Sequence, residues 1–348
     1  MVLVTGGAGF IGSNLADRLA GMGHTVRVLD ALVRPGVERN LAWLRIRHGA
    51  KIESMVADIR DTAAIQRGIA GVDAVFHLAA QVAVTTSLAD PLDDFDVNVR
   101  GTVNLLEALR REHRRVPFVF ASTNKVYGDL ADVALQLRDG AYLPRNDALR
   151  AHGVDESRKL DFHTPYGCSK GAADQYVLDY ARSFDFPTCV LRMSCIYGPR
   201  QMGTEDQGWV AHFMMRALSG QSIGIYGDGR QVRDILNVAD AVDAYIAAWR
   251  SIETVKGRAF NLGGGPENAV TLRRLIGQIE SLVGNETMLS FHDWRPGDQR
   301  YFVANASAAR TALGLAPPLD WRIGVAQLAS WLESQTPGLV PSSEGVAA

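Results

Sequence analysis

The chain opens with a strand, a glycine-rich turn and a helix in immediate succession. Residues Met1–Thr5 form an apolar, β-branched run typical of a buried strand, and Gly6-Gly-Ala-Gly9-Phe-Ile-Gly12 follows at once. Helical periodicity then continues over Ser13–Ala20. A glycine triplet alone is weak evidence for a function. The flanking strand and helix strengthen it, because the N-terminus of the helix then directs free N–H groups and the positive end of the helix dipole at the turn. A pyrophosphate binds at such a position.

The residues of this turn have separate expected roles at a dinucleotide site. Gly6 permits the tight turn, Gly9 lets the backbone approach phosphate, and Gly12 lets the helix lie close to the strand. Phe10 and Ile11 are the helix residues between the last two glycines. We therefore expect all five to contact the cofactor.

A second strand, predicted over Thr25–Asp30, ends in an acid about twenty residues beyond the glycines. There a carboxylate accepts hydrogen bonds from an adenosine ribose, and it repels the 2′-phosphate of NADP. Asp30 therefore favours NAD. Arg34 and Arg39 lie near enough to keep NADP open, and an acid is also ordinary at a strand end.

Strands and helices alternate through the first half of the chain. Further strands are predicted at Lys51–Val56, Asp73–Leu78, Val116–Ala121 and Thr188–Met193, with helices near Thr62–Ile69 and Pro91–Glu112. Repeated strand–helix units predict an α/β fold of Rossmann type, a doubly wound parallel sheet with helices on both faces. Ligands in such sheets bind beyond the C-terminal ends of the strands.

Several candidate cofactor contacts follow directly after these strands. Asp58 and Ile59 are positioned to touch adenine, and the small side chains of Ala79 and Ala80 let a cofactor lie close to the backbone. Each residue could also belong to an ordinary connection between a strand and a helix. The evidence for a cofactor site is that all of them follow the ends of strands. The complete set after the strands is Asp58, Ile59, Leu78, Ala79, Ala80, Gln81, Ser122 and Thr123.

The second half of the chain has a looser pattern. Helical stretches are predicted near Trp209–Leu218, Asp240–Arg250, Leu272–Leu282 and Gly324–Glu333, mixed with short strands and loops. A chain of 348 residues is long for one compact unit. We expect an NAD-binding domain over 1–193 that carries the catalytic residues, and a smaller mixed α/β substrate lobe over 194–335. Some segments of the lobe should return to the first domain, and 336–348 should be a flexible tail.

Tyr166 and Lys170 are four residues apart and would share one face of a helix. A tyrosine hydroxyl normally titrates near 10, and a neighbouring cation favours the phenolate and lowers that pKa. Such a pair suits proton removal from an alcohol while hydride leaves the same carbon. Alone, the pair is more often a surface tyrosine and a solvated lysine, so its weight comes from the dinucleotide site.

With these motifs in order, the chain resembles the extended short-chain dehydrogenase/reductases, which include nucleotide-sugar epimerases and dehydratases. The resemblance runs over nearly the whole chain. It implies that Thr123 polarises the reacting sugar oxygen and that Asn98 supports the cofactor site. The dehydratases carry an Asp-Glu pair after this threonine, whereas Asn124 and Lys125 follow it here. Dehydration is therefore not expected.

Longer motifs resemble the branch of epimerases that acts on carbon 2 of a CDP-linked hexose. They are Gln81–Ser87, Ser122–Asp129, Leu160–Tyr176, Asp206–Trp209 and Gln231–Asp234. The resemblance implies that Arg233 and Arg295 pair with the nucleotide diphosphate, as guanidinium geometry also suggests. Asp298 would contact the nucleotide ribose or orient the arginine. The expected substrate-binding residues are Thr86, Thr123, Asn124, Cys195, Arg233, Arg295 and Asp298.

Two positions depart from the pattern. Cys195 stands where many epimerases have asparagine, and a thiol is a weaker hydrogen-bond partner. Asn305 replaces the usual aspartate near the C-terminus.

The expected reaction uses NAD⁺, which takes hydride from a sugar carbon and returns it to the opposite face of a transient keto sugar. Tyr166 removes and returns the hydroxyl proton, Lys170 keeps it ionised and holds the nicotinamide ribose, and Thr123 binds the sugar oxygen. Epimerisation at another carbon or of a UDP-hexose remains an alternative. So do a net NAD(P)-dependent oxidoreductase and a non-catalytic NAD-binding protein.

Composition excludes other partners. A net charge of −2 with no basic run gives no case for nucleic acid, and no apolar stretch reaches the ~18 residues of a membrane span. The histidines are scattered, so we expect no metal site. Three cysteines without a CxxC motif, and a glycine strand that starts at Met1, suggest the cytoplasm. By resemblance we expect a homo-oligomer, a dimer or tetramer, formed through the helices near Pro91–Glu112 and Tyr166–Ser183.

Overall fold

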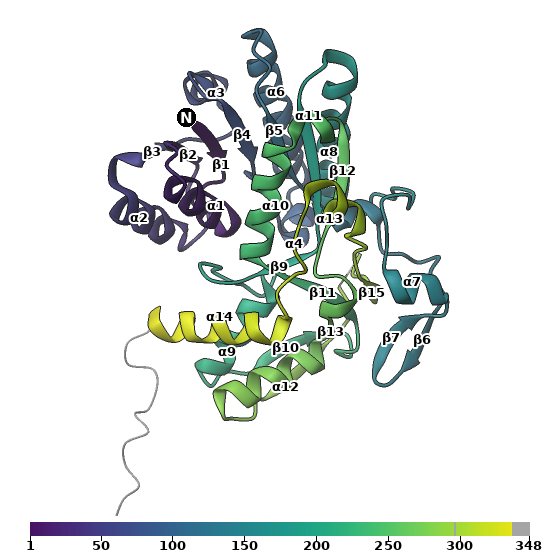
Figure 1. Ribbon diagram of the computed structural model, residues 1–348. Helices are drawn as coiled ribbons and strands as arrows, with labels where there is room; N and C mark the ends of the chain where they lie inside the picture. The colour runs from purple at the N-terminus through teal and green to yellow at the C-terminus, as the bar shows by residue number, and fades with distance from the viewer. Residues whose placement is uncertain (296, 336–348) are drawn as a thin grey trace, which may run out of the picture.

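A seven-stranded parallel sheet forms the centre of the computed structural model, which describes residues 1–295 and 297–335 (Figure 1). Its strand order is β12-β8-β5-β4-β1-β2-β3, and every neighbouring pair is parallel. The predicted α/β Rossmann-type fold is confirmed. The strands are β1 (Val2–Thr5), β2 (Val26–Asp30), β3 (Ile52–Val56), β4 (Ala74–His77), β5 (Phe118–Thr123), β8 (Thr188–Met193) and β12 (Arg258–Leu262).

Helices cover both faces of this sheet because side chains alternate along each strand. Val2 and Val4 of β1 pack in one buried cluster, and Leu3 between them packs in the other. The first cluster includes α1 (Phe10–Gly21), α2 (Val37–His48) and α10 (Val238–Arg250). The second includes α3 (Thr62–Ile69), α6 (Gly101–Arg111) and α8 (Thr164–Phe184).

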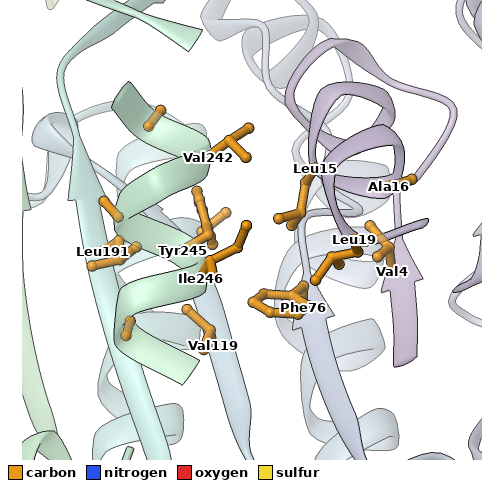
Figure 2. Close-up of a cluster of buried hydrophobic side chains, with 14 of the residues drawn as sticks. Val4, Leu15, Ala16, Leu19, Phe76, Val119, Leu191, Val242, Tyr245 and Ile246 are labelled. Carbon is orange, nitrogen blue, oxygen red and sulfur yellow. The ribbon is translucent and has the colours of Figure 1, made fainter. Parts of the chain in front are cut away.

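Figure 2 shows the first cluster between α1 and α10. Leu15 and Leu19 project from α1, and Tyr245 projects from α10 toward the strands. Phe76 of β4 lies between them and meets the Tyr245 ring edge-on, with centroids 6.4 Å apart. The helix α10 comes late in the chain. One face of the sheet that holds the glycine turn is therefore covered by residues beyond 193.

The other lobe has small sheets and its own core. Strand β11 (Val232–Asn237) pairs with β9 (Cys195–Tyr197), β13 (Ala269–Thr271) and β15 (Tyr301–Phe302), while β10 (Ile223–Tyr226) pairs with β14 (Leu289–His292). Helices α9 (Trp209–Leu218), α12 (Leu272–Val283) and α14 (Trp321–Gln335) pack against these strands below the main sheet in Figure 1. The predicted helices of this half are present, with α10 and α14 beginning a few residues earlier than expected.

Some elements were not anticipated. Helix α2 was missed, as was a hairpin of β6 (Leu135–Arg138) and β7 (Ala141–Pro144) followed by α7 (Asp147–His152). The helix expected over Pro91–Glu112 is divided into α5 (Pro91–Phe95), a π-helical turn over Asp96–Arg100, and α6. The remaining elements are α4 (Val84–Ala89), α11 (Ile252–Val255), α13 (Ser307–Leu313) and 3₁₀ turns over Gly49–Lys51, Asn124–Tyr127 and Pro266–Asn268. The predicted tail, 336–348, lies outside the described residues.

Candidate active site

The glycine turn after β1 is packed so closely that side chains are excluded. Gly6 has φ +66°, and a Cβ there would lie 2.7 Å from the Ala79 nitrogen. A Cβ on Gly12 would lie 2.1 Å from the Gly6 oxygen, which makes this the tightest contact of the turn. Gly7 is also constrained, since its Cβ would lie 2.8 Å from the Val4 oxygen, although no role was predicted for Gly7.

The N-terminus of α1 is open to an anion. Gly9 is its N-cap and offers no side-chain acceptor, and the first turn contains no acid. The first hydrogen bond to the cap runs from Ser13 N to Gly9 O, so the N–H groups of Phe10, Ile11 and Gly12 are available to a ligand. A pyrophosphate fits these donors and the helix dipole.

Asp30 links the end of β2 to the glycine turn. Its Oδ2 accepts a 3.0 Å hydrogen bond from Ala8 N, and its Oδ1 accepts a 2.9 Å bond from Leu32 N. A carboxylate has about four acceptor positions, so two remain for ribose hydroxyls. The half-buried Arg34 and the exposed Arg39 lie on the loop and helix that follow.

Asp58 and Ile59, which follow β3, have different surroundings: Asp58 is partly buried and Ile59 is buried. Asp58 accepts hydrogen bonds of 2.8–2.9 Å from the backbone and Nε of Arg60, which lower its pKa below the usual range. Ile59 belongs to the buried core, where it lies against Gly101. The Asp58 carboxylate is thus already engaged by Arg60, which also bonds Asp93 over 2.6 Å.

Asn98 holds the chain that follows β4. Gln81 N donates to Asn98 Oδ1 over 2.9 Å, and Asn98 Nδ2 donates to Gln81 O over 3.0 Å. The same Nδ2 donates to Ser169 Oγ of α8 over 2.9 Å. The π-helical turn carries Asn98 to this position, since such turns re-aim side chains at functional sites. Leu78, Ala79 and Ala80 are thereby fixed beside Gly6.

Thr123, Tyr166 and Lys170 are brought together where β5 ends against α8. Tyr166 and Lys170 are buried on one face of α8, at 9% and 4% exposure. The Thr123 hydroxyl donates to Asn124 Oδ1 over 3.4 Å and lies near enough to the Tyr166 phenol to lower the pKa of that phenol. The backbone N–H of Tyr166 donates to Ser87 Oγ over 3.1 Å, which anchors the start of α8.

The pKa values of this pair correct one expectation. Burial raises the pKa of Tyr166 to about 12, although the nearby Thr123 hydroxyl opposes the rise. Burial likewise lowers the pKa of Lys170 to about 7. The predicted lowering of the Tyr166 pKa by Lys170 is therefore wrong for the polypeptide itself, because desolvation of the phenol is the largest influence on its pKa.

Lys170 has a place for a further partner. Its ammonium lies 4.3 Å from the centroid of the Phe120 ring, and it donates no hydrogen bond to any residue of 1–295 or 297–335. A buried ammonium without acceptors is costly. Ribose hydroxyls of a dinucleotide would satisfy it, and the oxidised nicotinamide would add a positive charge that favours the phenolate.

A second group of charged residues is formed by Arg233, Lys125 and Asp298. Arg233 of β11 is 7% exposed and donates from Nη2 to Asp298 Oδ1 over 2.7 Å. Lys125 lies 3.9 Å from the same carboxylate and donates to Gly297 O over 3.1 Å. Lys125 was noted in the sequence only as the residue that replaces a dehydratase acid. Its charge signals a role, but its partners come from a loop about 170 residues away.

The other expected substrate residues occupy varied positions. Asn124 Nδ2 donates to Gln299 Oε1 over 3.2 Å, and Arg295 stacks over Tyr226 at 3.7 Å from the ring centroid. The Cys195 thiol accepts a 3.4 Å hydrogen bond from Trp209 Nε1.

Thr86 is exposed on α4. Asn305, the second departure, caps the next turn by accepting a 3.0 Å bond from Ser307 N. Over 1–295 and 297–335, no three His, Cys, Asp or Glu side chains are grouped to hold a metal ion. In the same part of the chain, no helix has both the length and the apolarity to cross a bilayer.

Comparison with known proteins agrees with this geometry. The NAD dependent epimerase/dehydratase family matches residues 2–263. The chain belongs to this family. CDP-paratose 2-epimerase of Salmonella typhi is 40% identical over 340 residues, which cover 96% of this chain and 99% of that protein.

Solved structures of the family have the same fold. UDP-glucose 4-epimerase of Thermus thermophilus, solved with NAD, is 30% identical with a TM-score of 0.82, over 96% of this chain and 99% of that one. UDP-glucuronic acid 4-epimerase of Bacillus cereus, solved with UDP-glucuronic acid and NAD, is 26% identical with the same score and coverage. NAD is the cofactor of this protein, as Asp30 and the glycine turn predicted.

Proposed function

We propose that this protein is an NAD-dependent nucleotide-sugar epimerase that inverts carbon 2 of a CDP-hexose. The observation that carries the proposal is the burial of Tyr166 and Lys170 on one face of α8, with Thr123 at the end of β5 near enough to act on the Tyr166 phenol. The likeness to CDP-paratose 2-epimerase over nearly the full length supports the choice of nucleotide and carbon.

Each residue has a defined task in this reaction. When bound, NAD⁺ supplies a hydride acceptor that is regenerated in every cycle. Tyr166, as phenolate, takes the proton from the hydroxyl of the reacting carbon, and it later returns that proton to the carbonyl oxygen of the keto sugar. Thr123 donates a hydrogen bond to this oxygen, and Lys170 favours the phenolate by its charge. The keto sugar presents its other face between the two steps, which inverts the carbon.

The charged group around Asp298 supports a nucleotide diphosphate as the handle of the substrate. Arg233, Lys125 and Arg295 offer cations, while Asp298 fixes the orientation of Arg233. Guanidinium groups bind phosphate through paired, charge-assisted hydrogen bonds. A carboxylate pair after Thr123, as water elimination requires, is replaced by the Asn124 amide and the Lys125 ammonium.

Product analysis tests the proposal. Purified protein is incubated separately with CDP- and UDP-hexoses, and the sugar configuration is read by NMR while absorbance at the NADH band is followed. We expect a C2 epimer from the CDP-sugar without accumulation of NADH. A C4 epimer or preference for the UDP-sugar would favour the other branch of the family, and stoichiometric NADH would identify a net oxidoreductase.

We also propose a homodimer in the cytoplasm. Large apolar side chains are exposed on α5 and α8, among them Leu92 at 78%, Phe95 at 48% and Tyr176 at 47%. Exposed apolar side chains that gather on one surface mark contact sites between proteins, and α5 packs against α8. The three cysteines are unpaired, in keeping with a reducing compartment. Light scattering after gel filtration tests the dimer, which a monomeric mass would exclude, and cell fractionation tests the location.

A further inference from the structure

The carboxyl group of Asp94 is buried behind the active-site helix and has no role in the reaction described above. Its residue is 1% exposed. Oδ1 accepts one hydrogen bond, 3.2 Å from Asn98 Nδ2. Within residues 1–295 and 297–335, Oδ2 has no hydrogen-bond partner and no cation forms an ion pair with the group. Because an unpaired buried carboxylate is costly, a nearby charge must account for it.

Asp94 is connected to the catalytic pair through two hydrogen bonds. It lies on α5, one turn before Asn98, and α5 packs against α8. Asn98 Nδ2 also donates to Ser169 Oγ over 2.9 Å. Ser169 is the residue directly before Lys170, and its hydroxyl donates to the backbone carbonyl oxygen of Tyr166 over 3.2 Å. Hydrogen bonds therefore connect the Asp94 carboxylate, through Asn98 and Ser169, to the turn of α8 that carries Tyr166 and Lys170.

The charge of Asp94 acts on that turn. Burial lowers the pKa of Lys170 to about 7, and the negative charges of Asp174 and Asp94 oppose this loss of the proton. Asp174 already has a full counter-charge, because Arg192 donates to its two oxygens over 2.9 Å each. Asp94 has no such cation at hydrogen-bonding distance. Burial raises the pKa of Asp94 and the positive charge of Lys170 opposes that rise, so each of the two groups favours the charged form of the other.

The other titratable groups facing this turn do not replace Asp94. His77, beneath Phe120, stays neutral because burial lowers its pKa to about 3. Burial raises the pKa of Cys168, so the thiol is uncharged at neutral pH. The neighbouring Asp93 points to Arg60 at 2.6 Å. The negative charge of Asp94 also raises the pKa of Tyr166.

We propose that Asp94 is a positioning residue that keeps Lys170 protonated, so that the lysine retains the charge its work beside Tyr166 and NAD requires. The effect of Asp94 on Lys170 does not depend on the proposed function. Only the use of the Lys170 charge in catalysis rests on it.

Direct titration of Lys170 provides the test. The chain has only five lysines, Lys51, Lys125, Lys159, Lys170 and Lys256, so protein labelled with ¹³C-lysine gives five ε-carbon signals, and Lys170→Arg identifies the one of interest. We expect Asp94→Asn to move the Lys170 midpoint to lower pH by ~1 unit, since removal of an anion disfavours the ammonium. The matched control is Asp96→Asn, two residues along the chain, whose carboxylate pairs with Arg100 at 3.0 Å and should leave the midpoint unchanged.

Turnover adds a second readout. Both limbs of the pH profile of Asp94→Asn should shift to lower pH, because the pKa values of Lys170 and Tyr166 fall together. A merely structural role would lower the melting temperature and leave the Lys170 midpoint at the wild-type value, and that result would overturn the proposal. If wild-type protein turns over no nucleotide sugar, the proposed function fails, but the NMR titration still decides the role of Asp94.

Two further variants cover the case in which Asp94→Asn does not fold. Asp94→Ser removes the charge with a smaller side chain and should show the same shift of the Lys170 midpoint. Asp94→Glu keeps the charge and should retain the wild-type midpoint even at reduced stability. Equal midpoints in the serine and glutamate variants would contradict the proposal.

Discussion

Arg233 Nη2 and Asp298 Oδ1 are joined by a 2.7 Å hydrogen bond that links the strand β11 to a loop 65 residues later in the chain. The arginine is buried, whereas the carboxylate is partly accessible, with a side-chain exposure of 23%. Asp298 also faces Lys125 at 3.9 Å. One carboxylate therefore holds two cations in place without cancelling their combined positive charge, as the proposed diphosphate site requires.

The first prediction concerns this pair. Asp298→Asn should raise the KM for the nucleotide sugar ~10-fold or more, with a smaller change in kcat, because a charge-assisted hydrogen bond contributes ~1.5–3 kcal/mol. Steady-state kinetics gives both constants. Asp293→Asn, on the same loop and exposed, is the control. A fall in kcat with an unchanged KM would assign Asp298 to the chemical step instead.

The second prediction concerns the proton. Tyr166→Phe should reduce kcat ~10²–10⁴-fold, the usual contribution of a positioned acid or base, while bound NAD is retained. Turnover and the NAD content of denatured protein are measured together. Tyr176→Phe removes an exposed phenol from the same helix and should leave both quantities unchanged. Near-normal turnover of Tyr166→Phe would rule out this role.

The third prediction concerns the glycine turn. Gly12→Ala places a methyl group 2.1 Å from the Gly6 oxygen, so the turn must open and NAD binding should be lost. Gly21→Ala lies in the same helix with nothing within 4 Å of its Cβ, and it should bind NAD normally. Its stability should be equal or higher by up to ~1 kcal/mol, because alanine favours helix. Fluorescence-monitored melting with added NAD compares them, and an NAD-dependent shift in Gly12→Ala would contradict the prediction.

The fourth prediction concerns acid stability. His77 is fully buried between the hydroxyls of Thr5 and Thr102, at 2.7 and 2.9 Å, and burial lowers its pKa from 6.5 to about 3. The unfolded chain takes up a proton below pH ~6.5 and the native ring does not, so stability present above that pH is lost as the pH falls toward 3. The loss is on the order of a few kcal/mol.

Urea unfolding between pH 7 and pH 4 measures this dependence. His77→Gln should be less stable at pH 7 and show a flatter decline toward pH 4. His152→Gln, an exposed histidine, should follow the wild-type curve. A slope in His77→Gln as steep as in the wild type would place the acid sensitivity elsewhere.

Features that depend on neighbours in the chain could be predicted from the sequence. The glycine turn, Asp30 and the spacing of Tyr166 and Lys170 are local patterns, since a strand alternates every two residues and a helix repeats every 3.6. The order of the parallel strands then places their ends on one edge of the sheet. The fold class and the NAD cofactor follow from these patterns, and the family was recognised by the resemblance of the longer motifs.

Other features were decided by the tertiary structure. The partners of Lys125 and Arg233 lie on a distant loop, and the π-helical turn that aims Asn98 has no clear signal in the sequence. The raised pKa of Tyr166 depends on burial beneath segments far along the chain, which reversed the direction expected from the neighbouring lysine. The sequence determined which groups we propose for the chemistry, because their types and spacing are local properties of the chain. Their charge states were set by desolvation, which exists only once the chain has folded around them.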